Sequence, residues 1–331
     1  MKSLIQKLVE IPGPSGYEMQ IRAAVQVEIE PFVSEVKIDP LGNLIAHKGA
    51  ASGGLKIMFA AHMDEIGIMV THVDENGFIR FTNIGGVNLR TCIGGRVRFL
   101  NGTVGVIGIE RTDNRSEVPP VEKMFIDIGA ADRKDCPVRV GDVAAFDRPF
   151  IDMGDRLVAK AMDDRIGVVV LIETLRQLKK TPHQLYFVFS AQEEVGTRGA
   201  ITAAYALEPD LGLAVDVTST GDTPKGIKMD VSLGKGPAIK VRDTGMLSDP
   251  RVVDWMVRVA QKAHIPYQFE VLESGSTDAR SIQIARAGVP SGCLSVPCRY
   301  VHTPSEMVDY SDVQNAVRLL LELLDGEDKP F

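Results

Sequence analysis

Carboxylate and imidazole side chains recur in this chain directly after or inside its short apolar runs. Five such positions occur: His62 after LKIMFAA (55–61), Asp163 after the short run ending at Lys160, Glu193-Glu194 after QLYFVFS (184–190), Asp216 inside LGLAVDV (211–217) and His302 after SGCLSVP (291–297). A single charged residue after an apolar run is ordinarily a solvated turn residue. In an open α/β sheet, however, ligands bind beyond the carboxyl ends of the strands. Five positions together therefore predict one site at one edge of a sheet.

The types of these side chains indicate a divalent metal site. Histidine and carboxylate ligands suit zinc, cobalt or manganese better than soft copper or iron–sulfur chemistry. Two divalent ions held by three carboxylates and two neutral imidazoles would keep a small positive charge, which a bridging hydroxide would cancel. That balance favours a water of low pKa. The predicted ligands are His62, Asp163, Glu194, Asp216 and His302.

Adjacent carboxylates predict a division of labour between Glu193 and Glu194. Neighbouring side chains of an extended segment diverge, so one glutamate can bind metal while the other faces the water on that metal. Asp64 lies two residues after His62 and is predicted to orient its imidazole. Asp278 stands at the start of a short helical segment and is predicted to cap it.

Helices and strands alternate in the first and last parts of the chain. Apolar spacing predicts helices over 17–30, 165–180, 249–264 and 311–326, the third capped by Asp249 and the last ending at Gly326. The apolar runs named above predict buried strands between them. This alternation indicates an α/β fold, with a mostly parallel or mixed sheet flanked by helices on both faces.

The middle of the chain has a different pattern. From about residue 70 to 157 short alternating runs are separated by turn signals such as Asp74–Gly77 and Asn101–Gly102, and no long helix is predicted. We therefore expect a small all-β barrel inserted into the α/β domain. The predicted organisation is residues 1–69 and 158–331 for the α/β domain and 70–157 for the insertion.

Composition excludes several classes of function. The chain has 331 residues and a formal net charge of −7 without a clustered basic face, so no nucleic-acid partner is expected. Its apolar stretches fall short of the roughly 20 residues that span a membrane. The N-terminus lacks the uninterrupted apolar core of a secretory signal, and four scattered cysteines do not form a disulfide framework. We expect a cytoplasmic protein with no membrane partner.

Taken together, the motifs resemble those of the M42 family of metallo-aminopeptidases, and the resemblance runs from end to end of the chain. The motifs that carry it are LVEIPGPSGYE (8–18), HMDEIG (62–67), AKAMDDRIG (159–167), FSAQEEVGTRGA (189–200), AVDVT (214–218), GSTDA (275–279) and RYVHTPSEMV (299–308).

This resemblance implies a role for each predicted site residue. One zinc, cobalt or manganese ion would be held by His62, Asp163 and Asp216, and a second by Asp163, Glu194 and His302. Asp163 would bridge them, joined to Asp164 by a cis peptide bond. A metal-bridging hydroxide would attack the peptide, Glu193 would act as general base and then acid, and Asp64 would support His62.

The resemblance also implies an architecture and a substrate. A zinc-peptidase-like catalytic domain would be interrupted by a small β-barrel or PDZ-like domain. Subunits would form homo-oligomers, tetrahedral dodecamers or dimers, and would release N-terminal amino acids from short peptides. Three alternatives stay open: a related metal-dependent deacylase of N-acyl amino acids, a glycosidase, and a non-catalytic shell. A glycosidase needs two carboxyl groups that flank the scissile bond and no metal. If His62 and His302 are metal ligands, they argue against a glycosidase.

Overall fold

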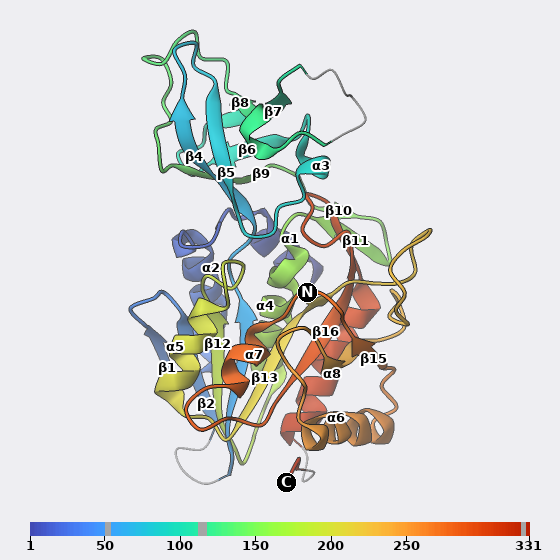
Figure 1. The fold of residues 1–331 in the computed structure, drawn as a ribbon. Helices are drawn as coiled ribbons and strands as arrows, with labels where there is room; N and C mark the ends of the chain where they lie inside the picture. The colour runs from blue at the N-terminus through green and yellow to red at the C-terminus, as the bar shows by residue number, and fades with distance from the viewer. Residues whose placement is uncertain (50–53, 112–117, 326–328) are drawn as a thin grey trace.

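The computed structural model describes residues 1–49, 54–111, 118–325 and 329–331. Figure 1 shows a large sheet flanked by helices, with a smaller group of strands, β4 to β9, standing beyond one of its ends. The predicted α/β fold with an inserted barrel is confirmed.

The larger part is built on one mixed sheet. Its strand order is β1-β2-β12-β3-β13-β16-β17-β11-β10, and β14 and β15 attach beside β16. These strands are β1 (Glu35–Ile38), β2 (Leu44–Gly49), β3 (Lys56–His62), β10 (Ile151–Asp152), β11 (Arg156–Ala159), β12 (Gln184–Ser190), β13 (Leu211–Thr218), β14 (Ala238–Arg242), β15 (Gln268–Val271), β16 (Ser291–Arg299) and β17 (Glu306–Asp309).

Four central strands, β12, β3, β13 and β16, run parallel to one another. Parallel strands covered on both faces read as continuous apolar runs, which is why the runs at 55–61, 184–190 and 211–217 become the middle of the sheet. Every residue of β13 is buried. The register pairs Ser190 with His62 and Asp216 with Ser295, so the carboxyl ends of all four strands share one edge.

Helices cover both faces of the sheet. α4 and α8 pack on one face with α1 and α2 beside them, α6 lies against α8 and β14, and α5 and α7 pack together on the opposite face. They are α1 (Lys2–Glu10), α2 (Met19–Ile29), α4 (Met162–Gln177), α5 (Arg198–Leu207), α6 (Pro250–Lys262), α7 (Asp278–Gln283) and α8 (Tyr310–Asp325). A short 3-10 turn, η1 (Glu30–Phe32), follows α2.

The helix ends test the predicted caps. α6 begins as predicted, with the Asp249 side chain accepting a hydrogen bond from the Arg251 N–H at 2.9 Å. The predicted cap of α7 is wrong, because the Thr277 hydroxyl accepts the Ala279 N–H instead. Asp278 is turned into the interior, where its carboxylate accepts a hydrogen bond from Ser190. The predicted stop of α8 at Gly326 lies outside the described residues.

The smaller part is a closed antiparallel barrel with strand order β4-β5-β8-β7-β6-β9. Side chains alternate between its interior and solvent, as in β6, where Val97 and Phe99 are buried and the two arginines are exposed. The predicted turn after β4 is present: Gly77, at φ +83°, donates its N–H to Asp74 O. Its elements are β4 (Gly67–Val73), β5 (Ile79–Ile84), α3 (Leu89–Cys92), β6 (Arg96–Phe99), β7 (Val104–Ile109), η2 (Val121–Lys123), β8 (Met124–Asp127) and β9 (Val143–Phe146).

None of the helices in the described ranges has the length and apolar character needed to cross a bilayer.

Candidate metal centre and active site

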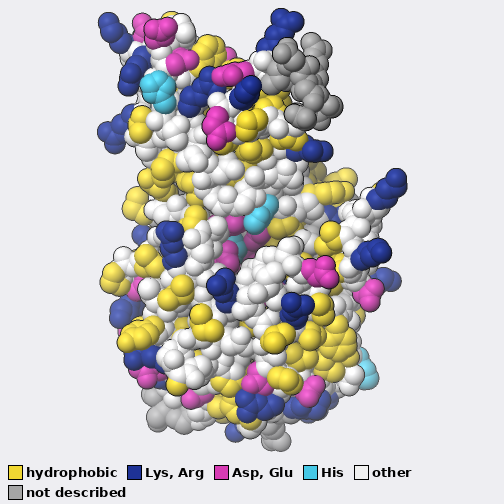
Figure 2. Space-filling view, viewed as in Figure 1, with side chains coloured by type: hydrophobic (Ala, Val, Ile, Leu, Met, Phe, Trp, Pro, Cys, Tyr) yellow, Lys and Arg dark blue, Asp and Glu magenta, His cyan; other side chains and the backbone are white. Residues whose placement is uncertain are grey.

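One cavity of about 530 Å³ contains all five predicted metal ligands together with Glu193. It opens where the carboxyl edge of the sheet faces the barrel, and Gly86, from the segment that follows β5, forms part of its wall. Figure 2 shows this place as a hollow near the middle of the molecule, where acidic and histidine side chains gather. The structure therefore brings the predicted residues together.

Each site residue is positioned by the end of a strand or helix. His62 is the last residue of β3, and Asp216 lies in the neighbouring β13. Glu193 and Glu194 occupy the loop between β12 and α5, and His302 lies in the turn between β16 and β17 with φ +62°. Asp163 comes from the first turn of α4. The parallel register of the central strands accounts for the convergence.

Asp163 lies at the centre of the cluster. Its Oδ1 is 3.0 Å from His62 Nε2, and its Oδ2 is 3.3 Å from His302 Nε2. Glu194 Oε2 is 3.2 Å from the same nitrogen of His302, and Asp216 Oδ1 is 4.0 Å from His62 Nε2. The carboxylate thus faces one imidazole with each oxygen, and a further carboxylate flanks each imidazole.

The described part of the chain contains two groups of three residues in which the possible ligand atoms all lie within 4.8 Å of one another. They are His62, Asp163 and Glu194, and His62, Asp164 and Asp216. Asp164 is an addition to the predicted set. Its oxygens accept the backbone N–H groups of His62 (3.2 Å) and Gly167 (3.0 Å), which identifies it as a support for the cluster.

The turn that carries Asp163 and Asp164 is tightly packed. The peptide bond between them is cis, as the resemblance implied. A Cβ on Gly167 would lie 2.4 Å from Asp164 Oδ1, so a glycine is required where α4 passes this carboxylate. The spacing Asp-Asp-x-x-Gly in the sequence therefore has a steric cause.

Burial and mutual repulsion disturb the titration of the carboxylates. Burial raises the pKa of Glu194 and, together with the neighbouring Asp163, raises the pKa of Asp216 well above its usual value. Burial alone would raise the pKa of Asp163 as well, but hydrogen bonds from His302 and His62 outweigh it and hold that pKa well below its usual range. The cluster is an acidic site that needs positive charge to stay ionised.

Neighbouring carboxylates raise the pKa of both imidazoles. Burial lowers the pKa of His302, yet hydrogen bonds to Asp163 and Glu194 outweigh it and raise that pKa to about 12. The pKa of His62 is also raised well above its usual value, because the hydrogen bond to Asp163 and the nearby carboxylates of Asp64 and Glu193 outweigh burial. Each imidazole is thus held where carboxylates converge, as expected of ligands that share a cation.

The donor chemistry fits divalent metal ions. Imidazole nitrogens and carboxylate oxygens are suitable ligands for zinc, cobalt and manganese. Glu194 Oε1 is buried and has no hydrogen-bond partner within the described structure, although buried carboxylate oxygens are normally satisfied. A cation held between Glu194, Asp163 and His302 would satisfy it.

Glu193 adjoins the ligands without bonding to an imidazole. Its Oε2 lies 3.9 Å from His62 Nε2, beyond hydrogen-bond distance. Burial raises the pKa of Glu193 well above its usual value; His62 opposes the shift and Asp216 adds to it. A carboxyl group with a raised pKa beside a ligand cluster is a candidate for accepting and returning a proton.

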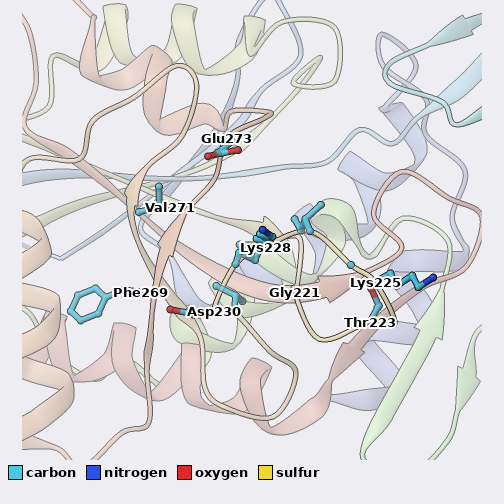
Figure 3. A pocket seen from close by; sticks show the side chains of 12 residues that line it. Gly221, Thr223, Lys225, Lys228, Asp230, Phe269, Val271 and Glu273 are labelled. Carbon is cyan, nitrogen blue, oxygen red and sulfur yellow. The ribbon is translucent and has the colours of Figure 1, made fainter.

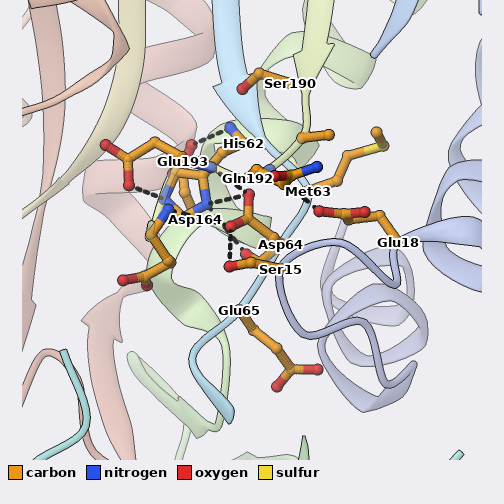
Figure 4. A network of polar contacts seen from close by, with 12 residues as sticks. Ser15, Glu18, His62, Met63, Asp64, Glu65, Asp164, Ser190, Gln192 and Glu193 are labelled. Atoms are coloured by element: carbon orange, nitrogen blue, oxygen red, sulfur yellow. Dashed lines mark hydrogen bonds and ion pairs between the residues drawn. The ribbon is translucent and has the colours of Figure 1, made fainter. Parts of the chain in front are cut away.

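Asp64 contacts the loop that carries the glutamates as well as His62 (Figure 4). His62 Nδ1 lies 3.0 Å from the backbone oxygen of Asp64 but 3.6 Å from its carboxylate, longer than a hydrogen bond. The carboxylate instead accepts the N–H groups of Glu193 (2.9 Å) and Glu194 (3.1 Å) and the hydroxyl of Ser15 (2.6 Å). Asp64 therefore contacts both the glutamate pair and the imidazole of His62.

Two supporting carboxylates were not identified from the sequence. Glu306 accepts the Asp163 N–H at 3.0 Å and the His302 N–H at 2.8 Å, one with each oxygen, and is 1% exposed. Glu18 accepts the N–H groups of Gly16 and Gln192. The signal available was position alone: Glu306 follows His302 by four residues within one motif, and Glu18 ends the motif at 8–18.

A buried ion pair lies beneath the cluster. Lys160 donates to both oxygens of Glu65, at 2.9 and 2.8 Å, and Arg165 donates to the backbone oxygens of Met63 and Leu8, each at 2.6 Å. These contacts tie the end of β3, the start of α4 and α1 together. These buried contacts fix the segments that carry His62 and Asp163 relative to each other.

Known proteins resemble this chain in sequence and in fold. The profile of the M42 glutamyl aminopeptidase family matches residues 42–319. A protein of Acetivibrio thermocellus is 48% identical over 98% of both chains. An aminopeptidase of the archaeon Desulfurococcus kamchatkensis, of known structure, is 40% identical, with a TM-score of 0.95 over 99% of this chain and 95% of that one.

A further solved structure, that of the TET1 peptidase of Pyrococcus horikoshii, has a TM-score of 0.88 at 32% identity, covering 98% of each chain. That protein is described as assembling into a tetrahedron or a large octahedral shell. Sequence and fold agree over the whole chain, so this protein belongs to the M42 aminopeptidase family and is a peptide hydrolase.

Proposed function

We propose that the protein is a dinuclear metallo-aminopeptidase that removes N-terminal residues from short peptides. The observation that supports it most is the position of Asp163, whose two oxygens face His62 and His302 separately. A carboxylate shared in this way is suited to bridging two ions. We assign His62, Asp163 and Asp216 to one ion and Asp163, Glu194 and His302 to the other.

Zinc, cobalt and manganese all suit this donor set. When bound, such ions lower the pKa of water and polarise the carbonyl of the scissile bond. The protein supplies the proton transfers. Glu193 takes a proton from the attacking water and returns it to the leaving amine, which its raised pKa and its position beside the ligands support.

Supporting residues keep this carboxylate in place. Asp64 accepts the backbone N–H groups of both glutamates, so the loop that carries Glu193 cannot turn away without breaking two charge-assisted hydrogen bonds. Glu306 has the equivalent function for the loops of Asp163 and His302. We infer that these two carboxylates are positioning residues of the reaction.

Recognition of a free α-amine at the ligand cluster explains why we propose an exopeptidase. An N-acylated peptide has no basic amine to offer there, so a deacylase acting on N-acyl amino acids would require different recognition at the same ligands. The aminopeptidase and the deacylase differ in whether the substrate carries a free or an acylated amine, so paired substrates distinguish them.

The organisation that we propose follows the same family. The barrel has its own apolar core, which supports residues 70–157 as an inserted domain between 1–69 and 158–331. The TET1 relative assembles into shells, which supports a homo-oligomer here, a tetrahedral dodecamer or a dimer. The described thiols are all unpaired, which suits the reducing cytoplasm. Light scattering of the purified protein tests the subunit number.

The decisive experiment compares leucine p-nitroanilide with its N-acetylated form, with cobalt or zinc added and with a chelator. We expect cleavage of the free form only, and loss of that activity in chelator. Cleavage of the acetylated form would favour the deacylase. Activity that survives complete chelation would overturn the metal-dependent mechanism and reopen the glycosidase alternative.

A further inference from the structure

The loop between β12 and α5, residues 191–197, carries Glu193 in an unfavourable backbone conformation. Gln192, at φ +58°, and Thr197, at φ +51°, both lie in the left-handed region that favours glycine. Other residues stay in this region only where the surrounding structure stabilises them. The contacts at the two ends of the loop therefore decide where Glu193 lies.

One neighbour of this loop is α7, a short helix that begins beside the active-site cavity. In the segment before it, Val271 and Glu273 line a separate cavity of about 720 Å³ beside β15 (Figure 3). Leu272 and residues 274–277 line the active-site cavity instead, and α7 follows directly. The helix packs against α5, so it connects the wall of the active-site cavity to the loop that carries Glu193.

Thr197 makes an unusual contact with this helix. It is the N-cap residue of α5, where a threonine hydroxyl ordinarily accepts an N–H group of the first turn. Its hydroxyl does not cap α5, because Thr197 Oγ1 lies 2.5 Å from Ser281 Oγ of α7. Both side chains are buried. The hydroxyl at the start of α5 is thus used to bind the neighbouring helix.

The main chain of Thr197 is bonded in turn to Glu193. The carbonyl oxygen of Glu193 accepts the N–H groups of Gly196 and Thr197, each at 2.8 Å. The N–H group of Glu193 donates to Asp64 at 2.9 Å. The peptide groups on the two sides of the Glu193 Cα are therefore fixed separately, one by Asp64 and the other through Thr197 and Ser281.

The other end of the loop is also bonded to α7. Ser190, the last residue of β12, donates its hydroxyl to Asp278, the first residue of α7, and both are buried. Asp278 and Ser281 are three residues apart and so lie on the same side of the helix. One side of α7 thus holds both ends of the loop that carries Glu193.

We propose that Ser281 and Thr197 are positioning residues of the reaction, which hold Glu193 beside the ligand cluster through its main chain. This inference rests on the proposed role of Glu193 as general base. Without the hydrogen bond between the two hydroxyls, Thr197 is free to leave its left-handed conformation and to draw the Glu193 carbonyl with it. A displacement of about 1 Å near the reacting groups can lower a rate by about 100-fold, so a small relaxation is sufficient.

The test measures kcat and KM of the metal-loaded protein on leucine p-nitroanilide for Thr197→Val, Ser281→Ala and the double variant. Valine keeps the shape of threonine and removes its hydroxyl. We expect each single variant to lower kcat by about 10-fold, with KM and metal content unchanged. The double variant should lose no more, because both changes remove the same hydrogen bond. Thr197→Ser keeps the hydroxyl and should recover most of the kcat.

Thr174→Val is the matched control. Thr174 is fully buried in α4, where its hydroxyl donates to the Val170 oxygen at 2.8 Å. The change therefore removes a buried hydroxyl that has no contact with the loop. The thermal unfolding temperature should fall in this variant as it does in Thr197→Val, but we expect only Thr197→Val to lose kcat.

Two results would overturn the proposal while leaving the aminopeptidase function intact. One is a loss of kcat in the double variant equal to the product of the two single losses, and the other is a Thr197→Val protein as active as Thr197→Ser. The comparison of the two Thr197 variants decides by itself if Ser281→Ala does not fold. Failure of the unmodified, metal-loaded protein to cleave leucine p-nitroanilide would instead overturn the proposed function, so the two failures are distinguishable.

Discussion

The barrel and the carboxyl edge of the sheet bury opposite kinds of side chain. Within the described residues of 70–157, every buried side chain that packs the barrel is apolar. At the sheet edge His62, Asp64, Asp163, Asp164 and Asp216 are all buried. Burying an ion costs several kcal/mol unless partners compensate it. The apolar core of the barrel therefore stabilises the fold, whereas the buried ionisable side chains at the sheet edge lower its stability and supply the groups needed for catalysis.

The largest expected effect of this difference is at Glu193. Replacing Glu193 by Gln removes the proton acceptor, so we expect kcat to fall by about 10²- to 10⁴-fold. The thermal unfolding temperature should be unchanged or higher, because a buried charge near Asp216 is removed. Rates on leucine p-nitroanilide measure the first effect, calorimetry measures the second, and metal content checks that both ions stay bound.

Glu208→Gln is the matched control, since the Glu208 side chain is 62% exposed at the end of α5 and pairs with Arg286 outside the cavity. It should leave the rate unchanged. A Glu193→Gln protein that retains normal turnover with both ions bound would show that another group accepts the proton.

In the barrel the expected effect is the reverse. Phe99 is 1% exposed in the barrel core, so Phe99→Ala should lower the free energy of unfolding by about 3–5 kcal/mol through lost burial and a cavity. The rate of the protein that stays folded should change little. Val106→Ala on the outside of the same barrel, at 44% exposure, is the control and should cost less than about 0.5 kcal/mol.

Denaturant unfolding at several temperatures measures both variants. If Phe99→Ala left stability unchanged but abolished activity, the comparison between the two regions would fail, because the barrel core would then be part of the catalytic machinery.

Gly86 follows barrel strand β5 and lies against His302 of the metal site. At this position a change in the barrel segment is expected to affect the chemistry of the sheet edge. A Cβ at this position would lie 2.6 Å from His302 Nδ1. Gly86→Ala should therefore displace the imidazole and weaken binding of one ion by about 10-fold, as changes beside metal ligands do. Titration calorimetry of the metal-free protein with zinc measures the loss.

Gly102→Ala separates this effect from general disturbance of the barrel. Gly102 has φ +91° and open space around it, so its substitution strains the backbone without touching the site. It should reduce stability and leave zinc binding unchanged. Equal zinc affinity in the Gly86→Ala protein would show that His302 tolerates the contact.

The same contrast explains which features could be predicted from the sequence. The central strands and the convergence of His62, Glu194 and His302 follow from apolar runs and from where parallel strands end. The barrel follows from period-two alternation broken by turns. These are local patterns, and each is visible within one segment of the chain.

The missed contacts depend on segments that meet only in the folded protein. Glu306 reaches the backbone of Asp163 because β17 pairs with β11, a register that the sequence does not display. Asp is the better N-cap residue by type, yet Thr277 caps α7 because Asp278 is buried against Ser190. Tertiary packing overrides the local preference here.

The smallest expected effect concerns this buried Asp278. Burial raises its pKa from 3.8 to about 6, against the hydrogen bond from Ser190. The folded protein thus holds a proton that the unfolded chain releases, so this stabilisation is present at low pH and is lost as pH rises through 6. Between pH 5 and pH 8 the loss should be about 1 kcal/mol, and Asp278→Asn should abolish it.

The measurement is the free energy of unfolding of the metal-free protein and of Asp278→Asn at both pH values. Their difference isolates Asp278 from the other carboxylates, which titrate in both proteins. Asp254→Asn, on the exposed surface of α6, is the control and should follow the unmodified protein at both pH values. If Asp278→Asn lost the same stability as the unmodified protein, Asp278 would be ionised throughout and the buried edge would be better compensated than its contacts indicate.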